Sequence, residues 1–288
     1  MPTATTRETR LLGAPLVLFL LALLGFPTIL NLVYSVSDVG FETLRSPRPE
    51  GFGNFEDVLS DRAFWGSLWF SLRFGALTAA LEVGLGLFLA VFLSPILRRH
   101  SWLLAVLTLP MMVAPAMMGL MYRLVLHEFV GPLPHYLFAW FGSSPAFLAP
   151  RNVFWTVVVI EVLQWTPFAL LLFHLAYESI PGEIREAARM DGAKGWWMFR
   201  RVELPMLLPT FGVALAIRFI DGVRVFDNIY VLVGSGAGGS TTSLPIYIYT
   251  AFFRGGDIGK ALAASVLFAA ASFVLLALAW RVIQRRPA

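Results

Sequence analysis

Residues 186–205 have the sequence EAARMDGAKGWWMFRRVELP, a charged and patterned stretch between two apolar runs of membrane-spanning length. The triplet EAA is followed by Gly192 after three residues, and V-x-L-P, which ends at Pro205, follows after nine more. A membrane protein rarely places its most patterned polar segment between two spans without a soluble partner that recognises it. The stretch therefore predicts a partner on one side of a membrane.

The composition is that of an integral membrane protein. Hydrophobic residues make up 58% of the 288 positions and charged residues only 14%, whereas soluble domains have about half and about a quarter. The net charge of +4 is explained by basic loops at a membrane surface, so we expect no nucleic-acid partner. The absence of cysteine excludes disulfides and thiolate metal sites and leaves the redox compartment open.

Six apolar stretches are long enough to cross a bilayer, which takes roughly 20 helical residues. They lie at about 11–36, 66–93, 102–126, 153–177, 205–227 and 260–283. The first is too long for the apolar part of a signal peptide and lacks a clear cleavage site, so we expect it to be retained as a span. Because a bilayer cannot hydrate an open backbone, the spans must be helices. We predict an all-α integral membrane fold, with residues 1–288 as a single transmembrane domain.

Basic residues indicate the orientation of these spans. Twelve of the 22 lysines and arginines fall in short segments on one side: Arg7, Arg10, Arg98, Arg99, Arg185, Arg189, Lys194, Arg200, Arg201, Arg281, Arg285 and Arg286. The loop 38–62 on the other side has six acids against three arginines. The positive-inside rule then places the tail 1–10, the loop 180–203 and both termini in the cytoplasm.

The loop 180–203 has the signals of a short helix. Pro181 and Glu183 suit a first turn, and Gly192 suits the end of the helix. Ala187 and Ala188 permit close approach of another surface. An amphipathic helix that rests on the inner leaflet is the alternative.

The spacing of the EAA stretch resembles the signature of permease subunits in ABC importers, with Val202 where isoleucine is usual. The likeness continues in WTPF at 165–168 and in SIPGEIREAA at 179–188, which resemble sugar permeases. The segment RFIDGVRVFDNIYVL at 218–232 is similar to an element of trehalose- and maltose-type permeases, whereas GSGAGG at 234–239 departs from the usual TGGGP. The chain resembles the first of two paired, binding-protein-dependent carbohydrate permeases.

This resemblance implies the fold of a type I ABC importer permease with six transmembrane helices and a cytoplasmic coupling helix. The implied ATPase-coupling residues are Glu186, Ala187, Ala188, Met190, Asp191 and Gly192, with Glu186 as the charged contact and Gly192 as the tight turn. The implied partners are a second permease subunit, a dimer of ATP-binding subunits and an extracytoplasmic sugar-binding protein. ATP and Mg would bind to the ATPase, with no cofactor on this chain, in the cell inner membrane. The implied substrate is a disaccharide or glucoside such as trehalose or maltose, with glycerol phosphate or another polyol as the alternative.

Two polar stripes indicate where the substrate passes. Glu161, Gln164 and Phe168 share one face of the fourth span, and Trp165 adds a flat apolar surface. At comparable depth, the fifth span carries a second stripe with Arg218, Asp221, Arg224 and Asn228, and Asp227 lies alongside. We predict a shared cavity for a sugar. The alternative is an internal ion pair of Arg218 with Asp221 that fixes the helices, with Trp165 as core. Arg73, Glu82 and His174 are interpreted as packing or gate residues.

Other functional classes have weaker support. Gly234-x-Gly236-x-x-Gly239 matches a dinucleotide fingerprint by its letters, but Pro245 follows it instead of a helix that could hold phosphate. We expect no metal site and no catalytic residues. A secondary transporter or channel that uses Glu161, Asp221 and Arg218 stays open as an alternative, as does a non-transporting sensor, although no inverted repeat is evident.

Overall fold

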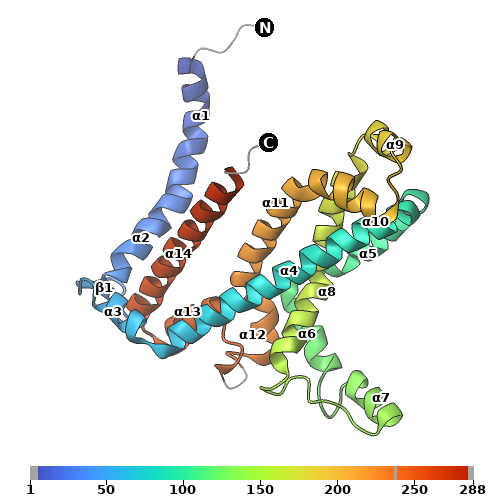
Figure 1. Ribbon diagram of the computed structural model, residues 1–288. Helices are drawn as coiled ribbons and strands as arrows, with labels where there is room; N and C mark the ends of the chain where they lie inside the picture. The colour runs from blue at the N-terminus through green and yellow to red at the C-terminus, as the bar shows by residue number, and fades with distance from the viewer. Residues whose placement is uncertain (1–5, 237–238, 285–288) are drawn as a thin grey trace. The chain divides into compact units, whose positions relative to one another are not determined.

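The computed structural model describes residues 6–236 and 239–284, which form two compact, mostly helical units (Figure 1). The first unit comprises the described residues up to Trp65 together with Ile248–Leu275, and the second is centred on Gly66–Tyr247. The helices and strands have these bounds: α1 Thr6–Leu20, α2 Phe26–Ser35, β1 Ser37–Asp38, β2 Arg48–Pro49, α3 Gly53–Ser60, α4 Arg62–Arg99, α5 Trp102–Met112, α6 Pro115–Val125, α7 Pro132–Phe141, α8 Val153–Glu178, α9 Gly182–Met190, α10 Gly195–Met198, α11 Leu204–Val223, α12 Asp227–Val233, α13 Leu244–Tyr249 and α14 Ile258–Gln284. Wider π-helical turns occupy Leu21–Gly25, Phe199–Glu203 and Thr250–Gly255.

In the first unit, α2 and α14 lie side by side (Figure 1) and are joined by a hydrogen bond from Asn31 Nδ2 to Ser265 Oγ of 3.1 Å. The two-residue strands β1 and β2 pair antiparallel, with Ser37 opposite Pro49. Asn54 of α3 is buried and donates to the carbonyl of Ser37 at 2.9 Å. These bonds close the loop that follows the first apolar helix.

In the second unit, α8 packs against α5 and α11, and α12 packs against α6. Two buried apolar clusters hold these helices. One includes Phe74, Val157 and Ile229, and the other includes Leu170, Phe173 and Leu207. The core is therefore divided along the length of α8, and the predicted polar stripe of α8 lies between the two clusters in the chain.

The distribution of apolar and polar side chains on α8 indicates whether this unit faces water or hydrocarbon. Trp155, Val159 and Leu163, spaced four residues apart on one face, are 60%, 55% and 52% exposed, whereas Gln164 is fully buried. Water would favour the reverse distribution. Exposed apolar faces and buried polar groups are the distribution expected in hydrocarbon.

Four helical segments of the described residues are long and apolar enough to cross a membrane: Gly13–Ser35, Arg62–Arg99, Val153–Glu178 and Gly195–Val233. A fifth arises if the bent pair α5 and α6 is one span, and α14 is apolar over Ile258–Val274. The count of six spans stays a prediction.

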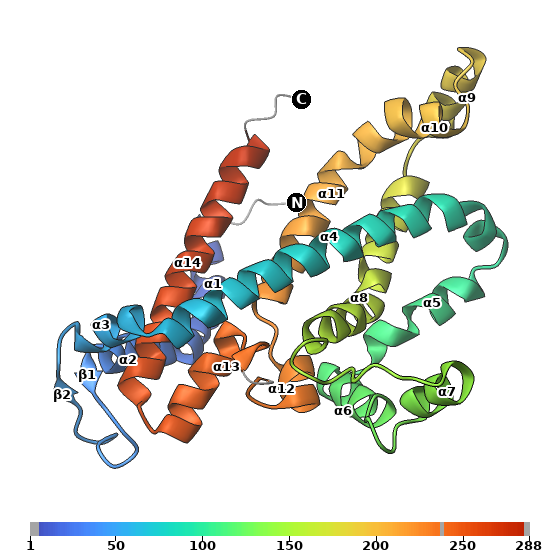
Figure 2. The ribbon, with the colours of Figure 1, turned by 60° about the horizontal axis from the view of Figure 1, so that its bottom comes forward.

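The stretch expected as one straight span, 102–126, is two helices with an angle of 85° between them (Figure 2). Pro115 begins α6, and the two residues before it, Val113 and Ala114, have extended backbones with ψ of 131° and 136°. A proline disfavours the helical conformation in the preceding residue, which explains the break. The stretch 205–227 differs as well, since α11 ends at Val223 and a turn precedes α12.

Candidate functional site

A cavity of 320 Å³ lies within the second unit, where α6, α8, α11 and α12 meet. It is lined by Pro115, Glu161, Trp165, Asp221, Arg224, Val225, Phe226, Asp227 and Asn228. The volume falls within the usual range for small-molecule sites, about 300–1,000 Å³. Aromatic rings and polar groups border the same space, as in a site for an amphipathic ligand.

One wall of the cavity is a chain of hydrogen bonds through Asn228. Its Nδ2 donates to Glu161 Oε2 at 2.7 Å and to Gln164 Oε1 at 3.0 Å. Gln164 Nε2 in turn donates to the carbonyl of Val113 at 2.9 Å, at the break between α5 and α6. Backbone freed at membrane depth needs a partner inside the protein, and Gln164 is that partner.

A second cluster surrounds Arg218, which is 4% exposed. Its guanidinium carbon lies 4.6 Å from the ring centre of Trp165 and 4.6 Å from that of Phe168. The guanidinium pairs with Asp221, and its Nη1 lies 4.0 Å from Glu82 Oε2. The charge of Arg218 is thus engaged by two carboxylates and two aromatic faces.

The predicted substrate-path residues therefore separate into two groups. Trp165, Asp221, Arg224 and Asn228 border the cavity. Gln164, Phe168 and Arg218 are not among its lining residues. Gln164 contacts the lining residue Asn228, and Arg218 lies over the rings of Phe168 and of the lining residue Trp165. The ion pair of Arg218 with Asp221, the alternative interpretation of these residues, is present.

Sequence reasoning missed two lining residues, Pro115 and Phe226. Pro115 carried a usable signal, because a proline within an apolar run suggests a helix break. The contact of Glu82 with Arg218 carried none, since it joins residues far apart in the chain.

The remaining polar span residues have separate surroundings. Arg73 lies over the Phe154 ring, 4.3 Å from its centre, which is a packing contact. His174 has a buried Nδ1 without a hydrogen-bond partner among the described residues.

The segment predicted to meet a soluble partner forms α9, Gly182–Met190, with Pro181 at its N-cap. The helix closes at Gly192, whose φ is +85°. The amide of Gly192 donates to the carbonyl of Arg189 at 3.0 Å, and the amide of Ala193 donates to that of Ala188 at 2.9 Å. These two bonds form a Schellman motif, which requires a left-handed residue and favours glycine. Gly192 is the turn residue of this helix.

None of the α9 residues is buried. Met190 is 87% exposed, and Glu186, Ala187 and Asp191 are exposed as well, whereas Ala188 is half-buried. Trp196 and Trp197, which follow in α10, are 67% and 51% exposed. The predicted coupling residues thus form an accessible surface on a helix with fixed ends.

Within the described ranges 6–236 and 239–284, no three histidine, aspartate or glutamate side chains lie together so that they could hold a metal ion. The buried carboxylates of Glu161 and Glu203 bond to the amide of Asn228 and to the guanidinium of Arg185.

This chain is similar to known proteins in sequence. Residues 82–286 match the family model described as "Binding-protein-dependent transport system inner membrane component". The chain is 35% identical over 228 residues to the trehalose/maltose transport system permease protein MalF of Thermococcus litoralis, which covers 78% of this chain and 75% of the relative. It is 41% identical over 111 residues to the trehalose transport system permease protein SugA of Mycobacterium tuberculosis, which covers 38% of this chain and 36% of the relative.

The fold also matches a solved structure, that of a bacterial alginate ABC transporter in complex with an alginate pentasaccharide-bound periplasmic protein. The TM-score is 0.84 at 20% identity, over 97% of this chain and 96% of the other. At this identity the likeness shows the fold, which is that of an ABC importer permease. With most of its length matched by the family model, the chain belongs to the inner membrane components of binding-protein-dependent transport systems, and its relatives are sugar permeases of ABC transporters.

Proposed function

We propose that this chain is one of two permease subunits of an ATP-driven importer, and that it conducts a neutral sugar delivered by an extracytoplasmic binding protein. The observation that carries the proposal is α9, an exposed helix with the EAA spacing that ends in a Schellman turn at Gly192. Its relatives with trehalose and maltose in their names support a disaccharide or related glucoside.

In this proposal α9 is the coupling helix. Met190 and Glu186 offer an apolar and a charged contact to a dimer of ATP-binding subunits, which would hold ATP and Mg. The exposed Met190 supports this role because a large apolar side chain on a polar loop suggests a covered surface. No cofactor is needed on this chain itself.

The cavity supports an uncharged substrate over glycerol phosphate. Its lining has three carboxylates, Glu161, Asp221 and Asp227, against one guanidinium, that of Arg224. Arg218, which would favour an anion, is buried and already engaged by Glu82 and Asp221. Because Arg218 offsets the charge of Asp221, the lining leaves Glu161 and Asp227 against the single guanidinium of Arg224, and an anionic substrate would gain no net attraction from it. The rings of Trp165 and Phe226 offer flat apolar faces to a sugar.

The proposed topology has six spans in the inner membrane, with both termini and α9 in the cytoplasm, in one transmembrane domain over residues 1–288. The excess of basic residues beside the inner ends of the spans supports it. Binding-protein docking outside and ATPase closure inside would alternate the access to the cavity.

The test uses the assembly purified through this chain from native membranes and reconstituted in proteoliposomes. We expect a stoichiometric ATP-binding subunit, and uptake of trehalose or maltose that requires both ATP and the binding protein. Uptake driven by a proton gradient without ATP would instead identify a secondary transporter. No flux of either sugar under both conditions would favour a sensor.

A further inference from the structure

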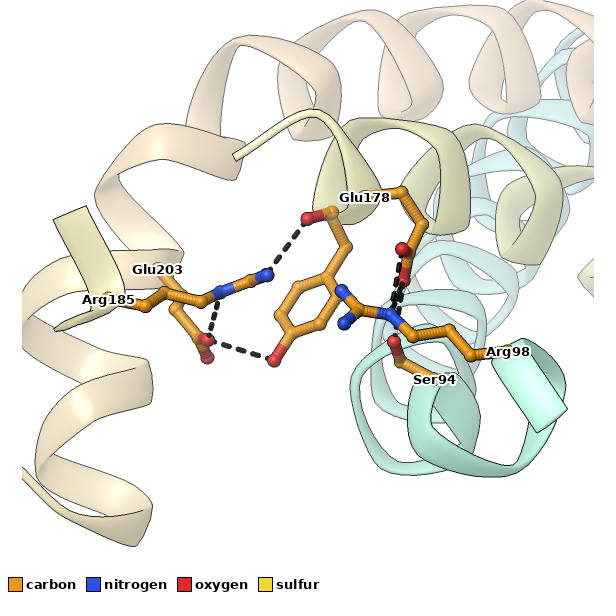
Figure 3. A network of polar contacts seen from close by, with 6 residues as sticks. Ser94, Arg98, Glu178, Arg185 and Glu203 are labelled. Carbon is orange, nitrogen blue, oxygen red and sulfur yellow. Dashed lines mark hydrogen bonds and ion pairs between the residues drawn. The ribbon is translucent and has the colours of Figure 1, made fainter. Parts of the chain in front are cut away.

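Arg185 attaches α9 to the inner ends of two neighbouring helices (Figure 3). Its Nε donates to Glu203 Oε1 at 3.1 Å, and its Nη2 donates to the carbonyl of Tyr177 at 2.8 Å. The guanidinium also lies over the Tyr177 ring, 4.2 Å from its centre. One side chain of α9 thereby contacts the end of α8 and the π-helical turn that leads into α11.

Tyr177 closes this cluster, because its hydroxyl donates to the same oxygen of Glu203 at 2.8 Å. The side chains of Arg185 and Glu203 are only 11% and 7% exposed. Arg185 is half-buried and Glu203 is buried, and separating the two would leave the charge of Glu203 enclosed without its partner, so the contact favours one geometry. We call Tyr177, Arg185 and Glu203 the α9 clamp.

A second contact continues from the α9 clamp to α4. Glu178, next to Tyr177, accepts from Ser94 Oγ at 2.8 Å, and Arg98 Nε lies 2.8 Å from both of its carboxylate oxygens (Figure 3). Ser94 and Arg98 belong to the last turns of α4. Two successive residues of α8 therefore link α9 and the start of α11 on one side to α4 on the other.

The rest of α9 is free to meet another surface. Within the described part of the chain, the side-chain hydrogen bonds from α9 to neighbouring helices come from Arg185, whereas Glu186 and Met190 are exposed. The helix has one attached face and one accessible face. A force applied to the accessible face must reach the spans through the attached one or through the backbone at the two helix ends.

We infer that Tyr177, Arg185 and Glu203 are positioning residues that transmit the displacement of α9 to α8 and α11, and that Glu178 with Arg98 passes it on to α4. The inference rests on the proposed function, in which α9 is moved by an ATPase. The planar guanidinium holds Glu203 and the Tyr177 ring at once, which a lysine ammonium cannot do. The π-helical turn Phe199–Glu203 presents Glu203 to it, and such turns often mark functional sites.

The experiment compares variants of the whole reconstituted assembly. Arg185→Met combined with Glu203→Gln removes both charges together, so that neither is left buried alone. Arg200→Met, an exposed arginine in the same π-helical turn, is the matched control. The measurements are the amount of ATP-binding subunit that copurifies, the rate of ATP hydrolysis, and the trehalose or maltose taken up per ATP hydrolysed.

We expect the double variant to keep its ATP-binding subunit and its hydrolysis, and to take up at least about tenfold less sugar per ATP, because closure of the ATPases then reaches the spans only through the backbone at the ends of α9. The control should stay within about twofold of the wild type. Arg185→Lys, which keeps the charge but not the planar contact, should remain defective.

Unchanged sugar uptake per ATP in the double variant would overturn the inference. A parallel loss of copurified subunit, hydrolysis and uptake would overturn it too, because it would show a merely structural role. If the double variant fails to insert, Tyr177→Phe decides: a lower uptake per ATP with normal assembly supports the inference, and wild-type coupling refutes it. If the wild type itself shows no ATP-dependent uptake, the proposed function fails. A failure of the inference alone would show in the variants, with the wild type still active.

Discussion

Gln164 joins three segments of the second unit although it lies within a single helix. Its amide nitrogen satisfies the carbonyl of Val113 at the break after α5, and its amide oxygen accepts from Asn228 of α12. Water cannot replace these partners in a fully buried position. The side chain therefore contributes to the shape of the cavity by fixing the helices around it.

Replacing Gln164 with leucine should lower the free energy of unfolding by about 1–3 kcal/mol, because the carbonyl of Val113 loses its side-chain donor and the amide of Asn228 loses one of its two acceptors. The measurement is thermal unfolding of the purified assembly in detergent. Leu163→Ala, on the exposed face of the same helix, is the control and should change stability less. An unaltered melting temperature for Gln164→Leu would mean that the break does not depend on this bond.

Trp165 borders the cavity and lies over Arg218. Trp165→Ala should raise the KM for sugar uptake by about tenfold, which corresponds to about 1.4 kcal/mol, the effect of one lost stacking surface. Trp165→Phe should lie between the wild type and the alanine variant. Trp155→Ala, which is exposed on the same helix, should leave the KM as it is. Equal effects of the two alanine variants would contradict a substrate role for Trp165.

At the scale of elements, α9 ends where Gly192 adopts a φ of +85°. Gly192→Val should leave the chain inserted but reduce ATP-driven uptake at least about tenfold, because a β-branched residue is strained there by about 1–3 kcal/mol and the turn must open. Immunoblots of membranes and uptake in proteoliposomes measure the two quantities. Gly182→Val, in the first turn of the same helix where φ is not positive, should be tolerated. Normal uptake by Gly192→Val would show that ATP-driven uptake does not need the left-handed turn at Gly192.

The elements that sequence reasoning located well are those whose signals are local. The fourth span was expected at 153–177 and α8 is Val153–Glu178, because apolar length and the flanking polar residues determine its ends. Gly192 was expected to end the short helix, and the structure confirms it. The break at Pro115 and the turn after Val223 lie within apolar runs, where hydropathy alone carries no boundary.

In the site, too, features with a local sequence signal were predicted and features that depend on helix packing were not. Asn228 was expected near the cavity because it lies on a polar stripe, and Trp165 because it offers a flat apolar face at the same depth; both border the cavity. Periodicity does not indicate which partner a polar group selects. The bonds of Gln164 to Val113 and of Glu82 to Arg218 depend on how separate helices pack, so they became visible only in three dimensions.

Across the whole chain, the helices must pack in the hydrocarbon of a bilayer and not in water. Apolar burial gives little attraction between helices in a bilayer, so close packing through small residues is needed. In the second unit, Gly86 of α4 meets Ala169 of α8, and Gly75 of α4 meets Gly222 of α11. These contacts let the backbones approach while Glu82 and Arg218 remain enclosed.

Gly86→Val should prevent assembly, because a β-carbon at this position would lie 2.5 Å from that of Ala169. Overpacking of this kind costs about 1–3 kcal/mol, and here the obstacle includes backbone atoms. Gly84→Val, two residues away with open space around it, is the control. The yield of monodisperse assembly after size-exclusion chromatography measures the effect, and equal yields would contradict the close α4–α8 contact.

The most direct test of the account determines which side of the membrane α9 occupies and what covers it. The chain has no cysteine, so Met190→Cys introduces a single thiol at a position that is 87% exposed, and Phe129→Cys marks the opposite side. With a membrane-impermeant maleimide, we expect the thiol at position 129 to react in right-side-out vesicles, and the thiol at position 190 to react only in inside-out vesicles after the ATP-binding subunit has been stripped. Labelling of position 190 from the outside, or labelling from the inside that is indifferent to the ATP-binding subunit, would contradict it.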